Sequence, residues 1–498
     1  MTSGGPAAGH LGRNRFPHLP NDFAFGVSSS APGIEGGAAI DGRTESIWDA
    51  VAAGPGRTAD GSTGAVAVDH YHRYPEDLAL LAELGVDAYR FSISWSRIQP
   101  GGTGPPNTEG LDFYDRLVDG LLAIGIEPWA TLYHSDLPVE TMMRGGWLDR
   151  DTAPAMADFA ALASDRIGDR VARWITMADP VIHMAYGHAL GVDAPGLTLL
   201  ADAIVVTHHL LLAHGLARQV LSETTDASIG IANRHTAVTP AGGSAPDRVA
   251  AAIYDAYHNG QFADPILLGR YPRLLRPLLD RHPELIRDGD LELISAPLDF
   301  YGVNYFHPTS VTASPDNATI PFDLSQFNEL TVTENDWPIH PRSLGAVLHG
   351  LTDRYPNLPP LVVTENGAAF SDVEFSSTGD ATSTPQDSGR IDYVASHIAA
   401  IDQAIAEGVD VRGYFHRGLT DAWEGSEGFT RQFGLVRVSE DSLSRTPRAS
   451  FAFFQKVIGE HRRRRTSEAG AHDASASLLT ESPPAPPALT DSPPGPPC

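Results

Sequence analysis

Short apolar runs alternate with longer segments of helical periodicity along most of the chain. The runs that are typical of strands cover 23–30, 88–95, 127–134, 173–179, 227–235, 299–306, 360–366 and 411–417. Between them, apolar residues recur with helical spacing over 76–84, 111–124, 152–167, 201–222, 247–259, 342–354 and 390–406. Eight strands that alternate with helices predict parallel βα units, and eight such units close a barrel. We therefore predict an α/β fold with a single (β/α)8 TIM barrel. An open doubly wound sheet is the alternative, but no glycine-rich phosphate loop follows the first strand.

The two ends of the chain differ in composition from the predicted barrel. Residues 466–498 consist largely of Ala, Ser, Thr and Pro, which offer little apolar surface to bury, so a disordered tail is expected there. Residues 1–15 are expected to form a flexible arm, and 16–465 the catalytic barrel domain. The basic run at 462–465 is predicted to be the solvated end of a helix.

Composition narrows the class of protein. The 498 residues include 35 Lys and Arg against 62 Asp and Glu, a net charge of −27, which argues against a nucleic-acid or anionic-membrane partner. No apolar run approaches the ~20 residues needed to span a membrane, and no secretory signal is visible, so we expect a cytoplasmic protein that acts on a small molecule. The single cysteine, Cys498, excludes an internal disulfide framework. No metal or organic cofactor is expected.

Polar residues follow the predicted strands, where the active site of a TIM barrel lies. They include Arg90, His134, Asp179, Asn233, Arg234, His235, Asn304, Glu365 and Arg417. Asp179 ends the fourth strand and Glu365 the seventh, so their carboxylates face one another across a closed ring. Such a pair suits acid–base or nucleophile–acid chemistry. An aspartate before a proline also serves as a turn or cap residue, so this pairing alone leaves the function open.

Longer motifs make the interpretation specific. They are DHYHRYPEDLALLAELGVDAYRFSISWSRI at 69–98, TLYHSDLP at 131–138, DFYGVNYF at 299–306, LVVTENGAAF at 361–370 and FGLVRV at 433–438. With these motifs the chain resembles glycoside hydrolase family 1, the retaining β-glucosidase family, over about 16–460. The resemblance implies a TIM barrel that uses two carboxylates.

The resemblance assigns both carboxylates. The family nucleophile lies in a TENG motif, which is intact here and implies Glu365, and Arg90 matches the arginine that keeps this carboxylate ionised. The family acid/base lies in an NEP motif that reads ADP here, so Asp179 takes that position with a side chain one methylene shorter. Retaining pairs lie ~5–5.5 Å apart. The shorter side chain of Asp179 withdraws its carboxyl group by ~1.5 Å, so hydrolysis with retention of the anomeric configuration becomes doubtful.

The family's sugar-binding positions are partly kept and partly changed. The matching residues that remain are His134, Asn304 and Glu424. The changed positions are Gly33 for the Gln of QIEG, Ser135 for the Trp of HWDLP, Phe306 for the second Tyr of NYY, and Arg417 and Gly425 for the two Trp of WSLLDNFEW. Each lost hydrogen bond weakens substrate binding by about 0.5–1.5 kcal/mol, so a substrate other than a simple pyranoside is expected. Ordinary drift with substrate choice is the alternative.

Two of these changes suggest different chemistry. Loss of the Tyr hydroxyl at Phe306 removes a donor from Glu365, which predicts a raised pKa and a better proton-abstracting base. Arg417 is expected either to bind an acidic, enolic or carboxylated substrate or to pair with Glu424 or Asp421.

The leading hypothesis is therefore a dehydratase that eliminates water from a hydroxylated non-sugar substrate, with Asp179 and Glu365 as the acid–base pair. In its broken motifs the chain is similar to the glycoside-hydrolase-like dehydratase of tirandamycin-type pathways, and it would belong to actinobacterial specialised metabolism. The alternatives are a retaining β-glycosidase or transglycosidase with altered glycone specificity, and a non-catalytic binding barrel.

Overall fold

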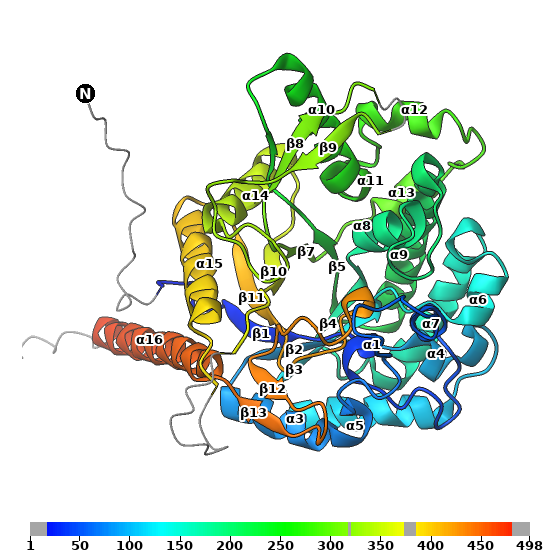
Figure 1. Cartoon of the computed structure of the whole chain (residues 1–498). Coiled ribbons are helices and arrows are strands. Elements are labelled where there is room, and N and C mark those ends of the chain that lie inside the picture. The colour runs from blue at the N-terminus through cyan, green and yellow to red at the C-terminus, as the bar shows by residue number, and fades with distance from the viewer. Residues whose placement is uncertain (1–16, 317–319, 373–384, 481–498) are drawn as a thin grey trace, which may run out of the picture.

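The computed structural model describes residues 17–316, 320–372 and 385–480 and confirms the predicted TIM barrel (Figure 1). Eight parallel strands close in the order β1-β11-β10-β7-β5-β4-β3-β2. They are β1 (Ala24–Ser28), β2 (Ala88–Ser92), β3 (Glu127–Tyr133), β4 (Arg173–Ala178), β5 (Ser228–Arg234), β7 (Phe300–Asn304), β10 (Leu361–Asn366) and β11 (Val411–Arg417). Each falls on one of the eight predicted runs, so the number and order of the strands were readable from hydrophobic pattern alone.

The seven predicted helices are also present. They are α3 (His70–Leu84), α5 (Thr108–Ala123), α7 (Thr152–Ile167), α9 (Ile204–Thr224), α10 (Ala245–Asp255), α14 (Pro341–Arg354) and α15 (Ser388–Ala406). Shorter helices lie in the loops between these elements. They are α1 (Ala31–Ile34), α2 (Ile47–Ala52), α4 (Trp95–Ile98), α6 (Val139–Met143), α8 (Pro180–Ile182), α11 (Gln261–Leu268), α12 (Arg276–Leu279) and α13 (Asp290–Ile294).

Two small sheets outside the barrel were not predicted. β6 (Val238–Pro240), β8 (Thr309–Ala313) and β9 (Phe322–Ser325) form one, and β12 (Val436–Val438) pairs with β13 (Arg445–Pro447) in the other. Helix α10 packs on the three-stranded sheet through a small separate core that includes Tyr254 and Val311 (Figure 1). Four of these five strands have only three or four residues, which is too few alternating positions to stand out in a sequence.

A long helix at the end of the described chain runs past residue 465. Helix α16 (Ala449–Thr480) continues through the basic run, where Arg462 pairs with Asp87 (2.9 Å) and Arg463 with Glu460 (2.7 Å). Residues 481–498 of the expected tail, and the expected arm at 1–15, lie outside the described residues.

One helix in the described part of the chain, Leu200–Thr224, is long and apolar enough by length and composition to cross a membrane, although no such run was expected. However, 72% of its most apolar window is buried inside the protein. Its histidines have partners there, because His208 contacts Asp290 (2.9 Å) and His214 contacts Thr176 (2.7 Å). The helix is therefore part of the barrel's core.

The inside of the barrel is layered, and this layering positions the site. One apolar layer consists of Ala88, Trp129, Ile175, Ala178, Ala232, Phe300, Val362 and Phe415. Side chains two residues apart on a strand share a face, so the residues two positions after Ala88, Ala232 and Phe415 also point inward. These residues are Arg90, Arg234 and Arg417. The carboxyl end of the barrel therefore has a floor of apolar side chains and a charged layer above it.

A buried ion pair anchors the loop that follows β1. Arg97 Nε lies 2.8 Å from Glu35 Oε2, the two side chains are 0% and 5% exposed, and the Tyr114 hydroxyl also donates to Glu35. Removing one partner of a buried pair costs about 3–5 kcal/mol, because the other charge stays buried and unpaired. We expect Arg97→Met to lower the free energy of unfolding by that amount in urea titrations.

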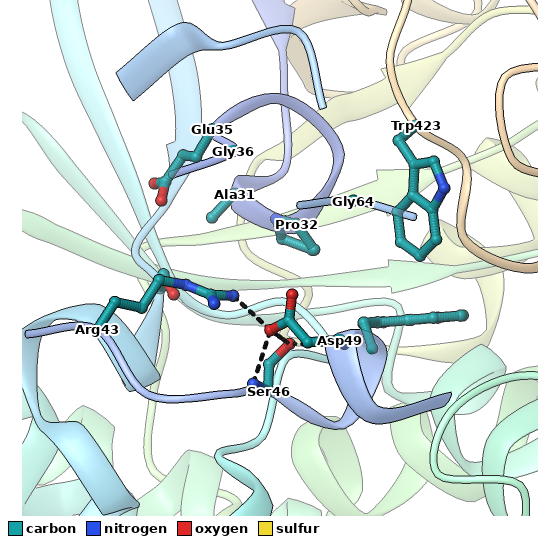
Figure 2. A pocket seen from close by; sticks show the side chains of 11 residues that line it. Ala31, Pro32, Glu35, Gly36, Arg43, Ser46, Asp49, Gly64 and Trp423 are labelled. Atoms are coloured by element: carbon teal, nitrogen blue, oxygen red, sulfur yellow. Dashed lines mark hydrogen bonds and ion pairs between the residues drawn. The ribbon is translucent and has the colours of Figure 1, made fainter. Parts of the chain in front are cut away.

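A neighbouring pair gives the control. Glu35, Arg43 and Asp49 line one small pocket (Figure 2). Arg43 contacts Asp49 there at 2.7 Å, but Asp49 also accepts hydrogen bonds from the Ser46 amide and hydroxyl, both 2.7 Å. Asp49 keeps these donors in Arg43→Met, so this variant should lose only about 1 kcal/mol. Equal losses in the two variants would contradict the proposed anchoring by Arg97.

Candidate active site

A cavity opens at the carboxyl ends of the barrel strands and brings most of the predicted site residues together. Its lining includes His134, Asp179, Glu365, Arg417, Glu424 and Phe433. These residues follow or end four different strands, β3, β4, β10 and β11. The cavity is therefore the place where the expected carboxylate pair meets.

Glu365 is held as an ion by its neighbours. It lies near the end of β10, and Arg90 Nη1 lies 2.6 Å from its Oε1. Burial raises the pKa of Glu365, but the positive charges of Arg90 and Arg417 outweigh burial and bring the pKa below its ordinary value. The predicted rise from the missing Tyr hydroxyl at Phe306 is therefore wrong, because the fully buried Arg90 controls this carboxylate.

Arg90 is itself fixed in place. Its Nε donates to Thr131 Oγ1 (3.1 Å), and Nη1 also reaches the Thr364 carbonyl (3.3 Å). The side chain is 0% exposed, so the ion pair with Glu365 is shielded from water. The arginine can stabilise the carboxylate without moving.

Asp179 has the opposite electrostatic character. Burial and the negative charge of Glu365 raise the pKa of Asp179 to about 6. Its Oδ1 accepts a 2.8 Å hydrogen bond from Asn304 Nδ2, and Thr364 Oγ1 donates to Asn304 Oδ1 (2.7 Å), which orients the amide. Asp179 caps the short helix α8 with a left-handed φ of 49°, a conformation that a non-glycine residue adopts only where its surroundings enforce it.

The two carboxyl groups are therefore pushed apart in pKa within one cavity. Glu365 keeps its charge to a lower pH than an ordinary glutamate, and Asp179 keeps its proton to a higher pH than an ordinary aspartate. A separation of this kind is what a nucleophile and a proton donor require.

Arg417 pairs with Glu424, which was one of the two roles expected of it. Its guanidinium carbon also lies 4.5 Å from the ring centre of Phe433 and 5.3 Å from that of Phe306. Burial raises the pKa of Glu424 despite the opposing charge of Arg417. Glu424, matched to a sugar-binding position, is thus already engaged by an arginine from β11.

His134 and Ser135 directly follow β3, and His134 lines the cavity. Burial lowers the pKa of His134 to about 4, so the imidazole is neutral near pH 7 and can donate or accept a hydrogen bond. Ser135 has a left-handed φ of 64°. Ser135 and Asp179 thus both have a left-handed backbone conformation. Residues with this conformation cluster at functional sites.

The two glycines at changed positions have little room around them. A Cβ on Gly425 would come within 2.7 Å of the Trp48 ring, and one on Gly33 within 3.0 Å of Ser30 Oγ and 3.1 Å of the Trp423 carbonyl. Trp48 packs edge-on against Trp423 at 5.6 Å. Sequence reasoning missed that Trp48, from α2, occupies space next to Gly425.

Asp421 belongs to the scaffold and does not reach the cavity lining. Arg448 binds it with two hydrogen bonds of 2.9 and 2.8 Å, and the Gly434 amide donates a third of 3.1 Å. Within the described residues, no group of three or more His, Cys, Asp or Glu is arranged to hold a metal ion.

The comparisons with known proteins place this arrangement in a family. A family model described as "Glycosyl hydrolase family 1" matches residues 15–463. The chain belongs to glycosyl hydrolase family 1. Beta-glucosidase A of Acetivibrio thermocellus is 39% identical over 447 residues, covering 88% of this chain and 98% of that protein. A bifunctional β-D-glucosidase/β-D-fucosidase of Bifidobacterium breve is 40% identical over 465 residues, covering 89% and 98%.

Solved structures of the family agree. The psychrophilic β-glucosidase of Micrococcus antarcticus superposes with a TM-score of 0.84 at 39% identity, covering 89% of this chain and 98% of that one. The family 1 β-glucosidase of Thermotoga maritima gives 0.84 at 36% identity, covering 90% and 99%. The similarity thus extends over nearly the whole length of these glycosidases.

These relatives correct the leading functional hypothesis. Family 1 relatives at about 39% identity over most of the chain are named β-glucosidases, which points to glycosidase activity. The expected dehydratase, and with it a lyase of specialised metabolism, is wrong. Too much weight was given to the changed sugar-binding positions, and the glycosidase alternative agrees better with the findings.

Proposed function

We propose that this family 1 protein is a retaining β-glycosidase, acting by hydrolysis or transglycosylation, with Glu365 as nucleophile and Asp179 as general acid/base. The separation of their pKa values within one cavity carries the proposal, because Arg90 favours the Glu365 anion while burial favours the Asp179 acid. The β-glucosidases among its relatives support the same reaction.

The proposed reaction has two displacements at the anomeric carbon. In the first, the Glu365 carboxylate attacks that carbon, the bond to the leaving oxygen breaks, and Asp179 gives that oxygen its proton. A glycosyl ester on Glu365 and a free alcohol result. In the second, Asp179 takes a proton from water or an acceptor alcohol, whose oxygen attacks the anomeric carbon and releases Glu365.

The sugar pocket is proposed to be altered rather than lost. His134, Asn304 and Glu424 are the proposed remaining contacts to sugar hydroxyls. Glycone specificity would be changed at Gly33, Ser135, Phe306, Arg417 and Gly425. Arg417 adds a cation beside Glu424, so the hydroxyl preferences of the pocket should differ from those of a pocket lined by two tryptophans.

The deciding experiment combines turnover with covalent trapping. The purified protein is incubated with an activated aryl β-glucoside and, separately, with a 2-fluoro-β-glycosyl trapping reagent, and is then weighed by intact mass spectrometry. The proposal expects a mass increase of one fluoroglycosyl group that peptide mapping places on Glu365. Neither turnover nor adduct with gluco-, galacto- and fuco-configured reagents would overturn it.

The pKa of Asp179 predicts an acidic activity optimum. The active form has Glu365 ionised and Asp179 protonated, so kcat/KM should be high below about pH 6 and fall about tenfold per unit above it as Asp179 loses its proton. The acid limb should lie below the ordinary range of a glutamate, because the pKa of Glu365 is lowered. A pH series with an aryl glycoside of poor leaving ability measures both limbs. An optimum above pH 7 would contradict this assignment of Asp179.

A further inference from the structure

Arg234 lies at the mouth of the barrel, where its side chain is not used by the catalytic pair. It ends β5 two residues after Ala232, which belongs to the inner apolar layer, so its side chain is directed to the inside of the barrel. Its neighbours Asn233 and His235 point the other way, since both contact the Tyr301 hydroxyl, at 2.8 and 2.9 Å. Arg234 is thus the one charged residue that β5 presents to the active-site opening.

Aromatic rings hold the guanidinium by its faces. The carbon at its centre lies 4.4 Å from the Phe306 ring centre and 5.1 Å from that of Trp337. His307 lies against the same tryptophan, with ring centres 5.2 Å apart. Stacking of this kind orients a guanidinium but leaves the N–H groups along its edge free to donate.

Those edge donors have no partner in the protein. Throughout the described residues, Arg234 donates no hydrogen bond to another residue and has no carboxylate within ion-pair distance, and its side chain is only partly buried. Asp193 is near enough to be influenced by its charge, but the Asp193 carboxylate instead accepts a 2.7 Å hydrogen bond from Ser426. The planar guanidinium can donate two parallel N–H···O hydrogen bonds to the two oxygens of a carboxylate.

The charges around the cavity lead to the same conclusion. Arg90 is paired with Glu365 and Arg417 with Glu424. Asp179 accepts its hydrogen bond from Asn304 and forms no ion pair with Arg234. In the described part of the chain Arg234 is therefore a cation of this region without a carboxylate partner, which makes it a local site of attraction for an anion.

The position of Arg234 indicates which part of a glycoside substrate it would contact. Arg234 and Trp337 are not part of the cavity lining shared by Glu365, His134 and Glu424. Arg234 is nevertheless close enough to Asp179 for its charge to act on that carboxyl group. Asp179 is the proposed proton donor to the leaving oxygen, so a group beside it and outside the sugar cavity meets the leaving group.

We propose that Arg234 binds a carboxylate on the aglycone, so that the preferred substrates are β-glycosides of flat, carboxylated aromatic alcohols. Trp337 and His307 would offer a surface for the aromatic ring while the edge of Arg234 takes the acid group. This inference rests on the proposed glycosidase function and names its substrate class.

Direct binding tests the proposal without turnover. Phenyl and 4-carboxyphenyl 1-thio-β-glucosides, which resist hydrolysis, are titrated calorimetrically against the wild type, Arg234→Gln, Arg234→Lys and Arg218→Gln. Arg218 is a partly buried arginine on α9 whose Nε donates to the Pro297 carbonyl (3.1 Å), away from the cavity, and it serves as the control. The wild type and the control should bind the carboxylated compound about 10- to 100-fold more tightly than the neutral one. Arg234→Gln should abolish this ratio and Arg234→Lys should restore part of it.

The outcomes separate this inference from the proposed function. Equal affinities in the wild type, or an undiminished ratio in Arg234→Gln, would overturn the role of Arg234. If the fluoroglycosyl adduct forms on Glu365 but no carboxylate preference exists, the glycosidase stands and the substrate class is wrong. If there is neither adduct nor binding of either compound, both are wrong. A shifted alkaline limb in Arg234→Gln with an unchanged ratio would show that the arginine only tunes Asp179.

Discussion

Replacing Glu365 by glutamine should lower kcat by at least about 10⁴-fold, because the amide cannot form the covalent glycosyl intermediate. The substituted side chain would keep the size of the original and an oxygen that can accept from Arg90, which lies 2.6 Å from the carboxylate, so the barrel should fold. The mass increase with the fluoroglycosyl reagent should vanish at the same time. Steady-state kinetics and intact mass spectrometry on the same preparation check both results.

Glu424→Gln is the matched control for this variant. Glu424 is a second carboxylate of the same cavity that is also paired with an arginine, but it has no proposed covalent role. Its loss should cost about 10- to 100-fold in kcat/KM, as expected for a binding contact, and the adduct on Glu365 should still form. A loss in Glu365→Gln no larger than in Glu424→Gln would contradict the assignment of the nucleophile.

Most of the fold could be predicted from the sequence because a TIM barrel repeats one signal eight times. Each barrel strand is a short apolar run followed by an amphipathic helix. An error in the bounds of one run therefore does not change the number of strands that is predicted. The three-stranded sheet β6-β8-β9 could not be predicted, because its short strands are set by packing on α10.

The candidate residues could be predicted, but their electrostatic states could not. Both Arg417 and Glu424 are visible in the sequence, yet only the three-dimensional arrangement shows that they pair. The pKa of Glu365 was misjudged because the loss of one hydrogen-bond donor at Phe306 was weighed without the buried Arg90 at 2.6 Å. Burial and distance decide which of several opposing effects is largest, and a linear sequence contains neither.

The functional error has the same origin. The changed residues, Gly33 and Gly425 among them, were interpreted as lost contacts to a sugar substrate. In the structure, Trp48 lies against Gly425, and Ser30 and the Trp423 backbone lie against Gly33. Other side chains therefore fill the space beside both glycines, and a changed motif residue does not by itself indicate a lost reaction.

Replacing Asp179 by asparagine should have an effect that depends on the leaving group. For a glycoside whose leaving alcohol needs a proton, kcat/KM should fall about 10²- to 10⁴-fold, because the general acid is gone. For an activated aryl glycoside that leaves without a proton, the first step should be nearly unaffected. The glycosyl ester on Glu365 should then accumulate, since no base activates the water that releases it. Burst kinetics and intact mass spectrometry measure this accumulation.

Two further observations make the role of Asp179 specific. Added azide, a nucleophile that needs no general base, should restore turnover of the activated substrate in Asp179→Asn and yield a β-glycosyl azide. The fall of kcat/KM above about pH 6 should disappear in the same variant, because the group whose pKa is raised to about 6 is missing. The asparagine can still accept the hydrogen bond that Asn304 gives to Asp179 at 2.8 Å, so a collapse of the site is not expected to mimic these effects. An equal loss for all leaving groups, with no response to azide, would show that Asp179 caps helix α8 without transferring a proton.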